Sequence, residues 1–125
     1  MPSHTTTITK VTRNTTLASN IPVADTPTTR RTGLLNHTEL LPGDGLYIDG
    51  GSNVHTVGMK FPIDIVFVHQ SQAAPGRATV VRTVEGVGEG RWEGGKHANS
   101  VLELPVGTIK GSRTVAGDWL RVEFT

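Results

Sequence analysis

The stretch that decides the fold is His55-Thr-Val-Gly-Met-Lys-Phe-Pro-Ile-Asp-Ile-Val-Phe-Val68. Pro62 suits the start of a strand, because proline lacks the N–H that a central ladder needs. The β-branched and aromatic residues of Ile63–Val68 predict a strand. Its two faces are both apolar, since side chains alternate along a strand. We therefore expect this strand to be covered on both sides and to lie at the centre of the core.

Asp64 interrupts the apolar pattern of this strand. A buried carboxylate must be hydrogen-bonded or paired, so two interpretations are open. In the first, Asp64 accepts backbone N–H bonds from the turn at Gly58–Phe61. In the second, Gly58 bends the chain so that His55 and Thr56 face Asp64 and the three line a polar patch. Met59 is interpreted most simply as core filling, beside this patch.

Length and composition limit the classes of function that fit this chain. The 125 residues predict a single domain, residues 1–125, with residues 1–4 disordered. Twelve Lys and Arg against eleven Asp and Glu give a net charge of +1, so neither nucleic acid nor a membrane surface is an expected partner. The absence of cysteine excludes disulfides and thiol chemistry. No cofactor is expected. The first residues lack a secretory signal, which predicts a cytoplasmic location.

The remaining segments predict a β-rich chain with little helix. The first 24 residues read as two strands with a turn at Ser19-Asn20, and Thr26 is expected to cap a helix that runs from Pro27 to about Leu35. The other predicted elements are strands at Leu46–Ile48, Ala78–Val84, Ser100–Pro105 and Trp119–Phe124, and a short helix near Ile109. The predicted fold class is mainly β (α+β): a compact, mostly antiparallel β-barrel or sandwich-like domain with one or two short helices.

Two further features are candidates for function. Residues 86–98 contain five glycines around Trp92, and the loop is interpreted either as a connection whose Trp92 caps the edge of the core or as an aromatic lid over a ligand. Arg30 and Arg31 form the largest basic cluster, and a structural ion pair is favoured for them over an anion site.

Several segments, in their order along the chain, resemble domain of unknown function family 192, a group of small bacterial and archaeal proteins. The resemblance covers residues from about 15 to 125 and rests on these segments: Val23-Ala-Asp-Thr26, Arg31-Thr-Gly-Leu-Leu35, Leu41-Pro-Gly-Asp-Gly-Leu46, His55-Thr-Val-Gly-Met59, Phe61-Pro-Ile-Asp-Ile-Val-Phe67, Val101-Leu-Glu-Leu-Pro-Val-Gly-Thr108 and Gly117-Asp118. It implies a compact, mainly β domain and supplies no activity. The positions that match the family signature are His55, Thr56, Met59, Pro62, Asp64, Glu103, Gly107 and Thr108.

This chain departs from the resemblance at two points. Many members carry Trp-Met-Lys-Asn-Thr before the Pro-Leu-Asp-Ile strand, whereas this chain has a shorter His-Thr-x-Gly-Met form, so roles built on that tryptophan do not transfer. Many relatives also carry signal peptides, and none is evident here.

Three functional hypotheses remain open from the sequence. The favoured one is a binding module for a small polar, carbohydrate-like ligand or a protein partner, through a patch of His55, Thr56 and Asp64 with Met59, Trp92 and Glu103 nearby. The alternative is a hydrolase in which Asp64 and Glu103 act as acid and base, or in which His55 and Asp64 bind a metal with His97 or Glu103. The third is a purely structural or interaction module.

Overall fold

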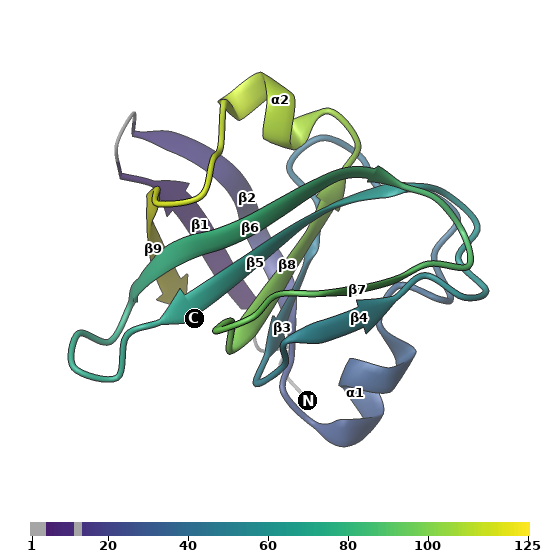
Figure 1. The fold of residues 1–125 in the computed structure, drawn as a ribbon, viewed down its shortest axis with the longest axis horizontal. Helices are drawn as coiled ribbons and strands as arrows, with labels where there is room; N and C mark the ends of the chain where they lie inside the picture. The colour runs from purple at the N-terminus through teal and green to yellow at the C-terminus, as the bar shows by residue number, and fades with distance from the viewer. Residues whose placement is uncertain (1–4, 12–13) are drawn as a thin grey trace.

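A computed structural model describes residues 5–11 and 14–125, so the expectation for residues 1–4 lies outside the described part. Seven strands form a closed barrel in the order β1-β2-β3-β8-β5-β6-β9, and β4 pairs with β7 in a separate two-stranded sheet (Figure 1). The elements are β1 (Thr5–Lys10), β2 (Thr15–Ala24), α1 (Pro27–Thr32), β3 (Leu46–Asp49), β4 (Asn53–His55), β5 (Ile63–Gln70), β6 (Arg77–Val87), β7 (Trp92–Gly94), β8 (Ser100–Pro105), α2 (Thr108–Ser112) and β9 (Trp119–Phe124).

The barrel is mostly antiparallel, and the predicted fold class is confirmed. The exception is the β2–β3 pair, which is parallel and is joined through helix α1. Thr26 caps that helix as expected, because its side chain accepts from the Thr29 N–H and the Thr29 side chain bonds back to the Thr26 backbone. The helix is shorter than predicted and ends at Thr32. The turn predicted at Ser19-Asn20 is wrong, because strand β2 continues through both residues.

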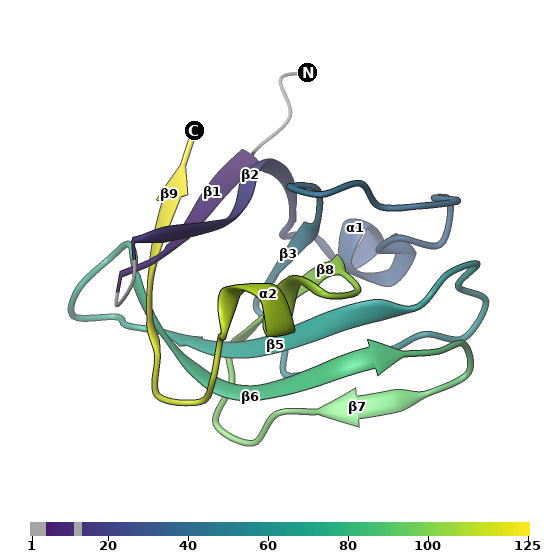
Figure 2. The same cartoon turned by 90° about the horizontal axis from the view of Figure 1, so that it is seen from above.

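The molecule has two hydrophobic cores, one inside the barrel and one outside it. The inner core includes Val66, Val68 and Leu102, and the outer core includes Ile63, Ile65 and Phe67. Strand β5 supplies alternate side chains to both, so the prediction that both of its faces are covered is confirmed. Helix α1 and the β4–β7 sheet lie on the outside of the barrel, where they cover the outer core (Figures 1 and 2).

Helix α2 packs at one end of the barrel, where its Ile109 joins the inner core (Figure 2). Beside it, the buried ammonium of Lys10 donates to the carbonyl oxygens of Ser112 at 2.5 Å and Arg113 at 3.1 Å, and lies 3.5 Å from the Asp118 carboxylate. Cations stabilise the last carbonyls of a helix, so this buried charge is fully engaged in structure. Neither of the helices in the described residues is long and apolar enough to span a membrane.

Candidate functional site

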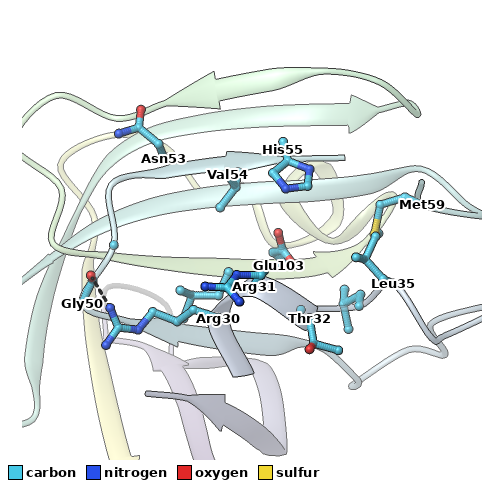
Figure 3. Close-up of a pocket in the computed structure, with 14 residues that line it drawn as sticks. Arg30, Arg31, Thr32, Leu35, Gly50, Asn53, Val54, His55, Met59 and Glu103 are labelled. Carbon is cyan, nitrogen blue, oxygen red and sulfur yellow. Dashed lines mark hydrogen bonds between the residues drawn. The ribbon is translucent and has the colours of Figure 1, made fainter. Parts of the chain in front are cut away.

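A pocket of about 300 Å³ opens between helix α1 and strand β4 on the outer face of the barrel (Figure 3). Its polar lining includes Arg30, Arg31, Asn53, His55 and Glu103. Its apolar lining is Leu34, Leu35, Ile48, Val54 and Met59. Backbone at Gly50 and Gly51 completes one side. A concave site with apolar walls and a few converging polar groups is typical of small-molecule binding.

Glu103 reaches this pocket because of its register in the sheet. It pairs with Leu46 on one side and Ile65 on the other, and both belong to the outer core. Residues directly opposite in adjacent strands point to the same face, so the Glu103 side chain leaves the barrel on its outer side. In Figure 3 it stands between α1, which carries the two arginines, and β4, which carries His55.

The Glu103 carboxyl group is buried without a protein partner. The residue is 4% exposed, and no hydrogen bond or ion pair reaches its carboxyl group from the residues that the structure describes. Burial disfavours the charged form and raises the pKa of Glu103 to about 7. The group is therefore close to half ionised at neutral pH, unlike an ordinary surface glutamate.

The two arginines of helix α1 line the pocket, and they differ in the number of acceptors that their guanidinium groups contact. Arg30 donates to the carbonyl oxygens of Gly50 at 3.3 Å and Asp25 at 3.2 Å, while its buried Nε has no partner. Arg31 is exposed, and its guanidinium makes no hydrogen bond or ion pair within the described residues. Neither arginine forms a salt bridge there, so the favoured structural ion pair is wrong.

His55 and Met59 line the pocket, as two of the predicted ligand-binding residues. The Val57 N–H donates to His55 Nδ1 at 3.3 Å, so a neutral His55 carries its proton on Nε2. The imidazole also packs on the Trp92 ring across the β4–β7 pair, with centroids 4.7 Å apart. Met59 is buried in the outer core, which agrees with its interpretation as core filling.

Asp64 lies on the opposite face of the sheet from the pocket. It pairs with Leu104 of the inner core, and its carboxylate accepts three backbone N–H bonds, from Gly86 at 2.9 Å, Gly107 at 3.1 Å and Ile109 at 3.0 Å. The local interpretation was right in kind but wrong in its partners, because the donors come from the end of β6 and the start of α2 instead of Gly58–Phe61. The second interpretation, in which Asp64 faces His55 and Thr56, is contradicted.

Thr56 and Trp92 also lie outside the pocket lining. The buried Thr56 hydroxyl donates to the Gly88 carbonyl at 2.5 Å and accepts from the Arg91 N–H at 2.9 Å, which ties the loop before β7 to the end of β4. Trp92 is 71% exposed, so it does not cap the edge of the core. The predicted patch of His55, Thr56 and Asp64 is therefore not assembled.

The predicted catalytic arrangements are not assembled either. Asp64 and Glu103 stand on opposite faces of the β5–β8 pair, which separates the proposed acid and base. Among residues 5–11 and 14–125, no group of three His, Asp or Glu side chains is placed to hold a metal ion. His97 is exposed in the loop before β8, where its carbonyl oxygen contacts the His69 ring. The proposed metal site of His55 and Asp64 with His97 or Glu103 is not formed.

The residues that line the pocket opposite Glu103 were mostly not predicted from the sequence. Arg30 and Arg31 carried a signal, since adjacent arginines on a short helix were weighed as an anion site. Gly50 and Gly51 carried none, because a glycine pair in a loop indicates a turn and not the side of a pocket. The convergence of these residues depends on the β2–α1–β3 connection, which brings α1 to the same pocket as Ile48 of β3 and Glu103 of β8.

The fold is that of a small β-barrel domain, and the pocket that contains Glu103 lies on its outer face beside a short helix. The sequence profile of the family DUF192, described as Uncharacterized ACR, matches residues 8–122. The chain therefore belongs to this family, as the resemblance indicated. No curated protein matches it.

Two solved structures share the fold. One is a proposed transcription regulator from Sinorhizobium meliloti 1021, with a TM-score of 0.79, 20% identity, and coverage of 97% of this chain and 94% of that one. The other is a protein of unknown function from Novosphingobium aromaticivorans DSM 12444, with a TM-score of 0.73, 18% identity, and coverage of 94% and 83%.

Proposed function

We propose that this protein binds a small polar ligand in the pocket between α1 and β4. The observation that carries the proposal is Glu103, a buried residue that lines a pocket of about 300 Å³ and whose carboxyl group is bonded by none of the residues 5–11 and 14–125. Burial of this carboxyl group carries a desolvation cost, which its raised pKa reflects. A ligand that donates to Glu103 would remove that cost, so the pocket is suited to recognise one.

The other buried charges support this interpretation by contrast. Lys10 and Asp64 are each engaged by three protein groups, which assigns them to structure. Glu103 contributes no such bond to the fold. Unsatisfied, strongly perturbed groups in a cleft are enriched at functional sites.

The test is a thermal-shift screen with monosaccharides, amino acids, nucleotides, dicarboxylates and polyamines, followed by calorimetric titration of any compound that shifts the melting temperature. A compound at about 100 times its dissociation constant adds about 2.7 kcal/mol, which is a shift of several degrees in a domain of this size. We expect the shift to vanish in Glu103→Gln. It should persist in Glu123→Gln, which removes an exposed carboxylate from β9, away from the pocket.

A catalytic role for the same pocket is the second candidate. A carboxyl group with a pKa of about 7 exchanges protons readily at neutral pH, which suits general acid–base catalysis. Glu103 would then act beside His55, since Asp64 is on the other face. Proton NMR of each bound compound over hours would detect turnover. Unchanged spectra for every bound compound would leave binding without catalysis.

We also propose that nucleic acid and membrane surfaces are not partners of this chain. The Sinorhizobium protein is described as a proposed transcription regulator, which makes DNA the alternative to test. The net charge of +1 does not supply the basic surface that phosphate contacts require. Fluorescence anisotropy with labelled duplex DNA should show no salt-dependent binding at micromolar protein.

A further inference from the structure

The pocket carries chemical groups of two kinds, and together they define a ligand class. This inference rests on the proposed function and names its ligand. The floor of the pocket offers the Glu103 carboxyl group, which no described residue bonds, and the side formed by α1 offers the Arg31 guanidinium, which has no acceptor within the described residues. The remaining lining is made of aliphatic side chains together with Thr32, Asn53 and His55.

The acidic end of the pocket is Glu103. Carboxylic acids and carboxylates accept hydrogen bonds, and a charge-assisted bond from a cation is about twice as strong as a neutral one. An ammonium group also offers three donors to the two carboxylate oxygens. A ligand ammonium would supply the opposite charge that no neighbouring residue gives to Glu103.

The basic end of the pocket is on α1. Arg31 makes no hydrogen bond or ion pair within the described residues, whereas Arg30 donates to the carbonyl oxygens of Gly50 and Asp25. Both side chains line the same pocket as Glu103, yet neither forms a salt bridge with it (Figure 3). Guanidinium groups recognise carboxylate and phosphate geometry through paired N–H bonds. The pocket therefore holds an acidic group and a cationic group that form no salt bridge with each other.

The walls between these two ends are aliphatic. Leu34, Leu35, Ile48 and Val54 line the cavity together with the thioether of Met59. The volume of about 300 Å³ is at the lower end for ligand pockets, so the occupant is a monomer and not a chain.

We propose that the ligand is a small zwitterion of the amino-acid class. Its ammonium group pairs with Glu103, its carboxylate pairs with the Arg31 guanidinium, and a short aliphatic side chain lies against Leu34, Leu35 and Val54. The three parts of such a molecule match the acidic floor, the basic side and the apolar walls of the pocket. A sugar would bond to Glu103 but would leave the Arg31 guanidinium without an anion.

Three matched probes test this assignment by calorimetric titration. L-leucine carries both charges, isoamylamine lacks the carboxylate, and isocaproate lacks the ammonium. Leucine should bind most tightly and isocaproate least. Glu103→Gln should weaken leucine and isoamylamine by at least about tenfold. Arg31→Gln should weaken leucine about tenfold and leave isoamylamine unchanged. Glu123→Gln and Arg121→Gln, both exposed on β9, are the matched controls and should bind as wild type.

The pH dependence of the amine probe is a second readout. An ammonium group binds ionised Glu103, so the affinity of isoamylamine should rise about tenfold between pH 6 and pH 8 as the carboxyl group loses its proton. The other titratable and charged groups that line the pocket are Arg30, Arg31 and His55. Because a protonated His55 would act in the same direction, the titration is repeated with His55→Gln, in which the rise should remain.

Two sets of results overturn the inference. One is isocaproate binding as tightly as leucine, or leucine binding that Glu103→Gln leaves unchanged in a variant whose circular dichroism and melting curve are those of the folded protein. The other is no binding of any of the three probes to wild type. If another compound of the wider screen then binds and is lost in Glu103→Gln, the proposed function stands and only the zwitterion is excluded. If no compound binds, both fail.

Discussion

The two faces of the β5–β8 pair each bury one carboxyl group, and the two groups differ in their hydrogen bonding. On the barrel side, Asp64 accepts three backbone N–H bonds and fixes the junction between β6 and α2. On the outer side, the Glu103 carboxyl group has no partner among the described residues, and it lines a cavity. Both residues match the family signature, yet one has the geometry of a structural residue and the other of a ligand-binding residue. Burial alone does not separate them, but hydrogen-bond satisfaction does.

The largest effect is expected at Asp64. Asp64→Ala should lower the free energy of unfolding by about 4 kcal/mol, because it leaves three buried N–H groups without an acceptor. Urea denaturation followed by circular dichroism measures the loss. Asp64→Asn keeps one accepting oxygen and should lose about half as much. If Asp64→Ala folds with wild-type stability, the three hydrogen bonds of Asp64 do not stabilise the fold, and the contrast with Glu103 is wrong.

The next effect is a pH dependence that belongs to Glu103. Its pKa rises from 4.5 in the unfolded chain to about 7 in the folded protein, so both states hold the proton below pH 4.5. As the pH rises toward 7, the unfolded state loses the proton first, and stability falls. The contribution lost is about 3 kcal/mol.

Glu103→Gln isolates this contribution, since the glutamine does not titrate. We expect the stability of wild type relative to Glu103→Gln to fall by about 3 kcal/mol between pH 4.5 and pH 8. Urea denaturation of both proteins at each pH gives the difference, from which the other titrating groups cancel. A difference that does not change with pH would mean that Glu103 is as well satisfied as Asp64.

A smaller effect is expected where the outer layer is attached. Thr56→Val keeps the side-chain shape but removes the hydroxyl that bonds the Gly88 carbonyl and the Arg91 N–H. Stability should fall by about 1.5 kcal/mol. Hydrogen exchange should accelerate at the amides of β4 and β7 and remain slow in β5. Equal acceleration in both would show that the outer layer and the barrel open together.

The smallest effect is expected at Trp92. It is 71% exposed, and its ring contact is with His55. Trp92→Ala should change the free energy of unfolding by less than about 0.5 kcal/mol, which a melting curve would register as a shift of a few degrees at most. A larger loss of unfolding free energy would show that Trp92, and not only Thr56, stabilises the attachment of the β4–β7 sheet to the barrel.

The site could be predicted only in part from the sequence. The alternation of side chains along one strand is a local property, but the register between two strands is not. Alternation along β5 correctly put Asp64 on one face and Ile65 on the other. The face on which Glu103 lies depends on the register between β8 and β5, which pairs Glu103 with Ile65. A shift of one residue would have brought Glu103 to the face of Asp64. Register is a property of two strands, so neither strand's sequence contains it.

What the sequence determined by itself is the set of local elements. The apolar run Ile63–Val68 specified a strand covered on both sides, Thr26 and Pro27 specified a helix start, and the glycine and proline content specified a β-rich domain with many turns. These features depend on propensities and on neighbours a few residues away, which is why they could be anticipated.

What only the tertiary structure decided is which residues meet. The donors to Asp64 lie 22 to 45 residues away in the chain, and the wall that faces Glu103 comes from a helix some seventy residues earlier. Barrel closure brings these segments together, because each strand must pair with two neighbours and the outer core must be covered by α1 and the β4–β7 sheet. The difference between a satisfied aspartate and an unsatisfied glutamate is therefore a consequence of packing, and no local pattern encodes it.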